Sequence, residues 1–343
     1  MIPTARGPFV SKVKENVALC RDHFRLLLGV SAFPPSGPGQ FVQVACRDVH
    51  AADAADTEIE WPAEGRLDVS DPPLHGPQAM LRRPFSLAGR RDTPDGVELD
   101  IIHRVVGIGT EWLSHLTPGD EVSVLGPLGN RFDFPSPDST ALLVGGGVGI
   151  PPMLYLAEKL AGRKVVAFAG ALTRELLPLK MIEEPSGDPA QPTLCIAEFA
   201  RHGIPSVITT DDGSAGIRGF VTQALEHYLD QAGFGFGGWG LGDEKNALFP
   251  IRNPTPFTPH PITIYTCGPE PMMKRVAQLA ASRGIECQVA VERAMACGMG
   301  TCQSCCIRVM KSNPQQPPLV GRDWCYRLAC TDGPVFRGAD LLW

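Results

Sequence analysis

The feature that most restricts the fold of this 343-residue chain is a change of pattern near residue 140. From there on, short apolar strands alternate with amphipathic helices. We expect strands at 140–147, 164–171, 192–200, 205–213 and 261–268, and helices at 151–162, 219–233 and 270–284. This strand–helix rhythm is typical of an open, Rossmann-like parallel α/β sheet.

The part of the chain before residue 136 has a different pattern. Segments 39–46 and 97–106 read as strands, and 116–132 contains a strand with turn residues on both sides. Several short strands punctuated in this way predict an antiparallel β-barrel. We therefore expect a barrel domain at 1–136, an α/β domain at 137–284 and a small cysteine-rich domain at 285–343. The polar segment at about 47–79 and the Gly/Pro-rich segment at about 232–260 read as insertions, the first with room for a hairpin.

Composition excludes several classes of protein. The formal charge is −6 with no basic stripe, which argues against nucleic acid as a partner. The N-terminus lacks the apolar core of a secretory signal, and the longest apolar stretch is broken by Gly and Pro, so no membrane span is expected. We expect a cytoplasmic protein whose 11 cysteines act as thiols and metal ligands rather than as disulfides.

The cysteine-rich segment carries the most specific local motif. Cys297, Cys302 and Cys305 are spaced C-x4-C-x2-C, the plant-type [2Fe–2S] spacing, which requires one more distant cysteine. Spacing alone leaves Cys325 and Cys330 equal as the fourth ligand. Structural zinc is the main alternative, although its sites usually have two C-x2-C knuckles and only one is present here. Unliganded thiols are the other alternative.

Two further stretches have patterns compatible with nucleotide binding. In "LLVGGGVGIPP", residues 142–152, a buried strand runs into glycines and a helix that opens at Pro, which suits a pyrophosphate but departs from the G-x-G-x-x-G spacing. In "LRRPFSLAG", residues 81–89, paired arginines precede a strand, an arrangement that suits a phosphate clamp but is also common on solvated surfaces.

The order of the motifs is more informative than any one of them. "RRPFS", "GIGTEWLSHLTPGDEVSVLGPLGNRF", "GGGVGIPP" and "CGPEPMM" together resemble the ferredoxin–NADP reductase superfamily, in which a β-barrel binds a flavin and a parallel-sheet domain binds a nicotinamide nucleotide. Two more stretches, 209–229 and 292–336, resemble the family of electron-transfer subunits of NAD-dependent (type B) dihydroorotate dehydrogenase. The resemblance covers nearly the whole chain apart from the two insertions.

The resemblance implies the ligands of three cofactors, FAD, a [2Fe–2S] cluster and NAD. The family's fourth cluster cysteine precedes an Asp-Gly-Pro-Val-Phe run, so the cluster ligands would be Cys297, Cys302, Cys305 and Cys330, with Cys306 and Cys325 as bystanders. Arg83 would meet the flavin pyrophosphate and Ser86 would lie near the isoalloxazine. The other implied flavin contacts are Pro84, Phe85, Ile102, His103, Arg104, Gly109 and Thr110. Those of the nicotinamide nucleotide are Gly146, Gly147, Gly149, Cys267, Gly268 and Pro269, although Cys267 reads equally well as a buried, inert thiol.

The resemblance also implies the function. Electrons from the FMN of a separate catalytic subunit, which oxidises dihydroorotate in pyrimidine biosynthesis, would pass through [2Fe–2S] and FAD to NAD⁺, within a heterotetramer. No motif for a substrate carboxylate or an acid–base pair is visible in this chain. One alternative is the small flavin/iron–sulfur subunit of another oxidoreductase, such as an NADH-dependent ferredoxin–NADP reductase or a sulfhydrogenase. A non-enzymatic alternative is an interaction protein with a structural metal site.

Overall fold

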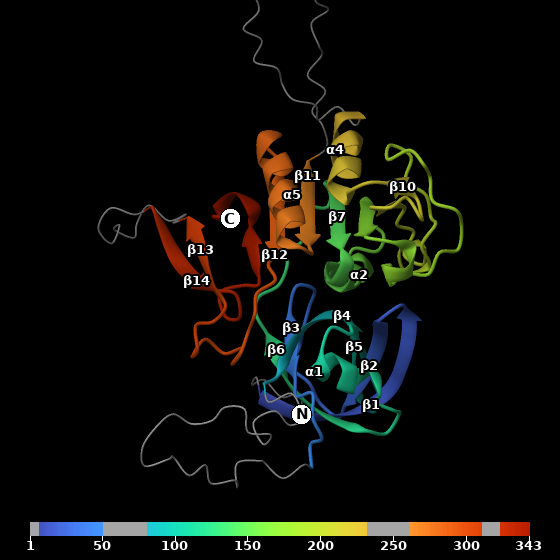
Figure 1. Cartoon of the computed structure of the whole chain (residues 1–343). Helices are drawn as coiled ribbons and strands as arrows, with labels where there is room; N and C mark the ends of the chain where they lie inside the picture. Colours follow the sequence, from blue (N-terminus) through green and yellow to red (C-terminus); the bar gives the residue numbers. More distant parts are fainter. Residues whose placement is uncertain (1–6, 51–80, 232–260, 311–322) are drawn as a thin grey trace, which may run out of the picture. The chain divides into compact units, whose positions relative to one another are not determined.

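A computed structural model describes residues 7–50, 81–231, 261–310 and 323–343 (Figure 1). Both predicted insertions lie largely or wholly outside these residues. By its internal packing the chain divides into two compact units. The barrel unit comprises Met1–Arg131, Arg293–Ile307 and Arg327–Pro334, and the sheet unit comprises Phe132–Glu292, Arg308–Tyr326 and Val335–Trp343.

The barrel unit is built on a closed antiparallel barrel with the strand order β1-β2-β5-β4-β3-β6. Its strands are β1 (Gly7–Cys20), β2 (His23–Val30), β3 (Phe41–Val44), β4 (Arg83–Thr93), β5 (Gly96–Arg104) and β6 (Glu121–Leu128), and helix α1 (Ile108–Ser114) follows β5. Residues two apart on a strand share a face. One such set fills the barrel with fully buried side chains that include Leu26, Leu28, Leu87, Leu99 and Ile101. The predicted barrel is confirmed.

The sheet unit contains a seven-stranded sheet in the order β10-β9-β8-β7-β11-β12-β15. The parallel strands are β7 (Thr140–Gly146), β8 (Val165–Ala171), β9 (Ser206–Thr210), β10 (Ile217–Arg218), β11 (Ile262–Cys267) and β12 (Glu286–Ala290). The last strand, β15 (Val335–Arg337), pairs with β12 in the antiparallel sense and is followed by the 3-10 turn η5 (Gly338–Asp340). The chain reverses its direction of travel across the sheet at β7, and such a reversal marks where open α/β sheets bind ligands.

Three helices connect these strands: α2 (Ile150–Lys159), α4 (Val221–Gln231) and α5 (Glu270–Ser282). Shorter turns are η3 (Gly147–Gly149), η4 (Arg174–Leu176) and α3 (Ala197–Ala200). Because parallel crossovers are right-handed, the reversal at β7 places α2 on one face of the sheet and α4 and α5 on the other. The predicted parallel α/β sheet is confirmed. None of the helices in the described ranges has both the length and the apolar character that a membrane span requires.

Two sequence-based assignments differ from the structure. Segment 192–200 is not a strand: it makes isolated bridges at Thr193 and Ile196 and then forms α3. The spacing of its buried residues Cys195, Ile196 and Phe199 suits a helical turn. In addition, β12 and β15 pair within the large sheet although both follow residue 285. The cysteine-rich tail itself contains a two-stranded sheet of β13 (Cys306–Met310) and β14 (Trp324–Leu328).

Candidate cofactor sites

The loop between β12 and β13 carries three of the four predicted cluster cysteines. It turns sharply through left-handed backbone at Gly298, Gly300 and Gln303, with φ of 69°, 90° and 58°. The turn directs backbone N–H groups at one sulfur: Met299 and Cys302 donate to Cys297 Sγ over 3.5 and 3.3 Å. Such donors stabilise a thiolate, the form in which cysteine binds iron.

The fourth cysteine joins this group from the turn after β14. Burial, followed by hydrogen bonding and charge interaction with Cys305 and charge interaction with Cys297, raises the pKa of Cys330 to about 11. Next to Cys330, the backbone N–H of Ala329 donates a 3.0 Å hydrogen bond to the backbone oxygen of Cys305, which holds the turn after β14 against the loop before β13. Thiolates near one another repel, and a bound cation relieves that repulsion.

The cysteines differ in exposure and in environment. Cys305 and Cys330 are buried, whereas Cys302 is exposed. A hydrogen bond with the Ser304 hydroxyl, 3.2 Å away, is the main cause that lowers the pKa of Cys302 to about 6. Within the described part of the chain, the thiols of Cys306 and Cys325 make no hydrogen bond or charge interaction with the thiols of the four predicted ligands. The donor set, four thiols with backbone N–H groups aimed at one of them, fits an iron–sulfur cluster. In those same ranges no three potential ligands converge as they would on one metal ion.

The two adjacent arginines at the start of β4, Arg82 and Arg83, make different contacts. Arg82 donates to the backbone oxygen and the hydroxyl of Ser123 on β6, at 2.9 and 2.8 Å, and is therefore committed to the barrel. Arg83 is half-buried, and within the described residues its side chain makes one hydrogen bond, of 3.2 Å, to the nearby Leu81 oxygen. Of the two guanidinium groups, Arg83 is the one available to a phosphate.

The predicted flavin side chains do not all lie on one face. The rings of Phe24, Phe85 and His103 cluster together, with His103 stacked on Phe24 at 5.8 Å and edge-on to Phe85 at 6.0 Å. By strand alternation they share the barrel-core face with Leu26, Leu87 and Ile101. Pro84, Ser86, Ile102 and Arg104 lie on the opposite, outer face. A flavin along this outer face would meet those four side chains and only the backbone at Phe85 and His103.

The start of α1 completes the barrel side. Thr110 Oγ1 accepts from the N–H groups of Val106 and Gly107, at 2.9 and 3.2 Å, and donates to the Gly107 oxygen. Its hydroxyl is thus used to shape the turn in which Gly109 also lies. Any contact of this turn with a phosphate would come from backbone N–H groups.

The predicted nicotinamide residues converge from two neighbouring strands. β7 and β11 are paired, with Cys267 opposite Gly145, so the loops after them lie side by side at the carboxyl edge of the sheet. Helices α2 and α5 both begin at this edge, and helix N-termini favour anions.

The glycines in these loops have two different roles. A Cβ at Gly149 would overlap the backbone of Cys267, so this glycine lets the two loops pack. Gly147 has a φ of +53° and open space where its Cβ would be. This bare backbone between two helix N-termini fits a pyrophosphate.

Sequence reasoning gave no role to Glu292, which lies two residues beyond the end of β12 at the same carboxyl edge. Part of Glu292 is open to solvent, yet burial raises the pKa of its carboxyl group. Burial, and then the charge of Glu292, raises the pKa of Cys267 to about 12, so this thiol stays protonated near neutral pH. The general rule that functional side chains follow the carboxyl ends of parallel strands was the available signal for Glu292.

A second missed group follows β9. Asp212 accepts from the backbone N–H and the hydroxyl of Ser214, at 3.0 and 2.6 Å, and Ser214 Oγ accepts from Arg174 N at 2.8 Å. These contacts join the ends of β8 and β9 at the carboxyl edge. The segment was part of the family resemblance, but none of its residues was assigned to a site.

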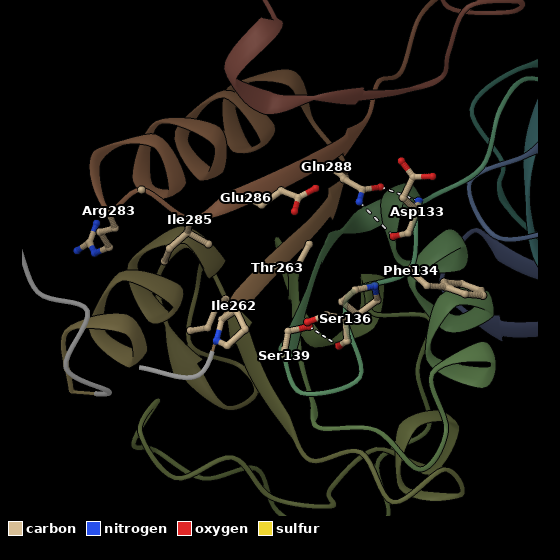
Figure 2. A pocket seen from close by; sticks show the side chains of 13 residues that line it. Asp133, Phe134, Ser136, Ser139, Ile262, Thr263, Arg283, Ile285, Glu286 and Gln288 are labelled. Carbon is tan, nitrogen blue, oxygen red and sulfur yellow. Dashed lines mark hydrogen bonds between the residues drawn. The ribbon is translucent and has the colours of Figure 1, made fainter. Parts of the chain in front are cut away.

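A hollow of about 490 Å³ lies at the other, amino-terminal edge of the sheet (Figure 2). Several of its polar groups are already paired: the Gln288 amide accepts from Asp133 N and donates to Asp133 O, at 2.9 and 3.1 Å, and Ser139 Oγ donates to Ser136 O at 2.7 Å. Arg283 pairs with Asp230 at 2.6 Å. Because it opens at the amino-terminal edge, this hollow is separate from the predicted nucleotide residues.

Comparison with known proteins gives consistent results. Residues 292–342 match the model of the iron–sulfur cluster binding domain of dihydroorotate dehydrogenase B. The electron transfer subunit of dihydroorotate dehydrogenase B (NAD(+)) from Desulforamulus reducens is 30% identical over 308 residues, covering 89% of this chain and 87% of that protein. The same subunit from Geobacillus kaustophilus is 34% identical over 267 residues, covering 77% and 80%.

Solved structures agree on the fold. The NADH-dependent reduced ferredoxin–NADP oxidoreductase, studied for flavin-based electron bifurcation, is 26% identical with a TM-score of 0.61, over 100% of this chain and 92% of that one. A cytochrome P450 reductase from Amycolatopsis is 22% identical with a TM-score of 0.51, over 82% and 68% of the two chains. The second likeness shows the fold alone.

Proposed function

The chain belongs to the family of electron-transfer subunits of dihydroorotate dehydrogenase B, and from that premise we propose that it carries electrons from a partner's FMN to NAD⁺. When bound, a flavin exchanges hydride with nicotinamide and single electrons with an iron–sulfur cluster. The observation that carries the proposal is that Cys297, Cys302, Cys305 and Cys330 all belong to the compact unit that contains the barrel.

The residues of this chain have distinct tasks in the proposal. The four thiolates hold the cluster, and the N–H groups of Met299 and Cys302 stabilise charge on Cys297. Arg83 binds the flavin pyrophosphate, while Pro84, Ser86, Ile102 and Arg104 provide the face for the ring. Gly147 and the first turns of α2 and α5 bind the nucleotide diphosphate. Glu292 and the protonated Cys267 thiol, at the carboxyl edge of the sheet, would be available for proton exchange at the nucleotide site.

The partner in this proposal is an FMN-containing dihydroorotate dehydrogenase subunit, with two copies of each chain in the complex. No carboxylate-binding motif for dihydroorotate is apparent in this chain, in keeping with oxidation on another subunit. We call the loop between β12 and β13, residues 291–305, the cysteine loop. Its exposed Cys302 is the proposed entry point for electrons. In this proposal the complex works in the cytoplasm.

The test is co-expression with the candidate FMN subunit, anaerobic purification and measurement of dihydroorotate-dependent NAD⁺ reduction. We expect FAD, two irons per chain of this type, as the plant-type cluster contains, and NADH formation that requires both subunits. Zinc in place of iron, together with no flavin, would refute the proposal.

The ligand set is tested by four matched variants. Cys330→Ala is expected to lose the cluster's visible absorption and to stop NAD⁺ reduction, because an iron loses a thiolate. Cys325→Ala and Cys306→Ala are expected to keep both, and Cys302→Ala to behave like Cys330→Ala. Loss of the cluster in Cys325→Ala with retention in Cys330→Ala would contradict the assignment.

A second candidate function is the small subunit of an NADH-dependent ferredoxin–NADP reductase. The observation that favours it is the likeness to such an oxidoreductase over the full length of this chain. Purification of the native complex distinguishes the two: a large flavoprotein partner that reacts with ferredoxin and NADP would support this alternative, and an FMN subunit that oxidises dihydroorotate would exclude it.

A further inference from the structure

Gln43 is a polar side chain in an unusual position on the outer face of β3. Its direct cross-strand neighbours are Pro84 on β4 and Leu125 on β6. Directly opposite residues of an antiparallel pair share a face with Cβ atoms about 5 Å apart. Gln43 therefore lies beside Pro84, on the face where Pro84 and Ser86 are proposed to meet the flavin. Outer-face residues of a barrel are normally accessible, but Gln43 is 0% exposed.

The cysteine loop is what covers this glutamine. Its Nε2 donates a long hydrogen bond, 3.4 Å, to the backbone oxygen of Ala296, the residue before Cys297. A Cβ at Gly298, the residue after Cys297, would lie 2.6 Å from Gln43 Cδ. Gly298 also has a φ of +69°. The Gln43 amide thus contacts the backbone on both sides of Cys297.

The second polar atom of the amide adds a constraint. Gln43 Oε1 is buried and has no hydrogen-bond partner within the described ranges. A buried, unpaired carbonyl oxygen destabilises the fold, so an apolar side chain of the same volume would cover β3 at lower cost. Packing alone therefore does not explain a glutamine here, whereas its contact with the cysteine loop does.

We propose that Gln43 is a positioning residue that fixes the Cys297 end of the cysteine loop against the flavin-binding face of the barrel and turns the positive end of its amide dipole toward that loop. The proposal rests on the proposed function, because it takes Cys297 as a cluster ligand and Pro84 and Ser86 as flavin neighbours. A donor dipole near a cluster thiolate stabilises the reduced state. The separation of the two cofactor sites, on which electron transfer depends steeply, is then set by one side chain.

The test uses Gln43→Met, which keeps the length and volume of the side chain and removes the amide. In the anaerobically purified holoprotein we expect normal flavin and iron content, a lower midpoint potential of the cluster and an altered electron paramagnetic resonance spectrum of its reduced form. Since outer contacts of metal ligands typically matter 10–100-fold, we expect electron exchange between the two sites to slow by about tenfold or more. Unchanged potential, spectrum and rate would overturn the proposal.

A matched control is Gln288→Leu, which removes a buried amide and its two hydrogen bonds in the sheet unit. It should leave the cluster potential and spectrum unchanged; an equal shift in this variant would show a general loss of stability and overturn the assignment to Gln43. If Gln43→Met fails to take up iron, hydrogen–deuterium exchange on the iron-free chains decides. Amides of 296–300 should exchange several-fold faster in Gln43→Met than in the parent, and equal exchange would overturn the proposal.

Failure of this inference is distinguishable from failure of the proposed function. A parent protein without an iron–sulfur cluster would refute the proposed function itself. A parent with the cluster, and a Gln43→Met variant identical to it in every measurement, would refute only the role of Gln43.

Discussion

At the scale of single residues, neighbours in sequence have separate tasks because strand geometry separates them. Arg82 is bonded to β6, whereas Arg83 is half-buried and, within the described residues, bonds only to the oxygen of Leu81. His103 faces the barrel core while Ile102 and Arg104 face outward. The motif "RRPFS" identifies the strand, but the contacts of each side chain follow from register and burial.

The two arginines provide the first prediction. Arg82→Met should lower the free energy of unfolding by about 1–3 kcal/mol, since it removes hydrogen bonds from a charged group, and should leave flavin affinity nearly unchanged. Arg83→Met should leave stability unchanged and weaken FAD binding about tenfold, the cost of roughly 1.4 kcal/mol of phosphate contact. Thermal unfolding and flavin titration of the apoprotein measure both. The reverse pattern would show that Arg82 holds the phosphate.

The second prediction concerns pH. Both ring nitrogens of His103 are buried without a hydrogen-bond partner in the part of the chain that the structure describes. Burial, with a smaller effect of the nearby His23, lowers the pKa of His103 from 6.5 to about 4. The unfolded chain therefore binds a proton that the folded chain rejects, and the stability of the fold falls as the pH drops from about 6.5 toward 4. The full effect is up to about 3 kcal/mol, at 1.36 kcal/mol for each pKa unit.

His103→Phe should flatten this dependence because a phenyl ring keeps the stack with Phe24 and does not titrate. Denaturant unfolding at pH 7 and pH 4.5 measures it. Phe24→Leu is the control: it should lower stability at both pH values and keep the difference between them. An unchanged difference in His103→Phe would assign the acid sensitivity to other groups.

At the scale of elements, periodicity predicted most strands and the three long helices between residues 140 and 284, because each has one buried face or is buried throughout, but it assigned no element to β1, β2 or α1. It failed at 192–200, where a short apolar run suits a strand or a helical turn equally. The pairing of β12 and β15 within the large sheet was also beyond reach, since their partners are distant in sequence. Spacing alone proposes Cys297, Cys302 and Cys305 as cluster ligands, whereas the choice of Cys330 over Cys325 needs the family resemblance and stays a prediction. No sequence motif marks Glu292 or Gln43, and their surroundings become visible only in the folded structure.

The loops after β7 and β11 provide the prediction at this scale. Gly149→Ala should lower the free energy of unfolding by about 1–3 kcal/mol, because the new Cβ overlaps the Cys267 backbone and forces the loops apart. Gly147→Ala meets no such obstacle and should cost only about 1–2 kcal/mol for left-handed backbone, while weakening NADH binding by crowding the diphosphate.

Calorimetry measures the stability of the two variants, and titration measures their affinity for NADH. The ratio of the loss in NADH affinity to the loss in free energy of unfolding should be larger for Gly147→Ala than for Gly149→Ala. A larger ratio for Gly149→Ala would mean that Gly149, not Gly147, faces the nucleotide.

At the scale of the whole molecule, the division into two units cuts across the order of the chain. The cysteine loop and Cys330 belong to the barrel unit, although the residues on either side of them, in β12 and β15, pair within the sheet unit. Composition and periodicity predicted both folds but offered no means to assign the tail, because that depends on contacts such as Gln43 with Ala296.

This division predicts which unit loses local stability when iron is removed. Binding to the folded state alone stabilises whatever is folded around the site. Removing iron with a chelator should therefore speed amide exchange in β3 and β4 and leave β7 and β11 nearly unchanged. Hydrogen–deuterium exchange followed by mass spectrometry, with and without the chelator, measures this. The Cys330→Ala variant, which is expected to lack the cluster, should show the same pattern without chelator. Equal acceleration in both units would contradict the assignment of the cysteine loop to the barrel unit.

The burial of Gln43 beneath Ala296 and Gly298 also has a consequence for biosynthesis. Chains are made from the N-terminus at about 5–20 residues per second, and early domains begin to fold during synthesis. The barrel strands leave the ribosome long before the segment that covers β3, and the whole parallel sheet is translated in between. Until then the nascent barrel has an uncovered patch around Gln43. With Cys330 as the proposed fourth ligand, we expect iron insertion to come late in the life of each chain, after translation has passed Cys330.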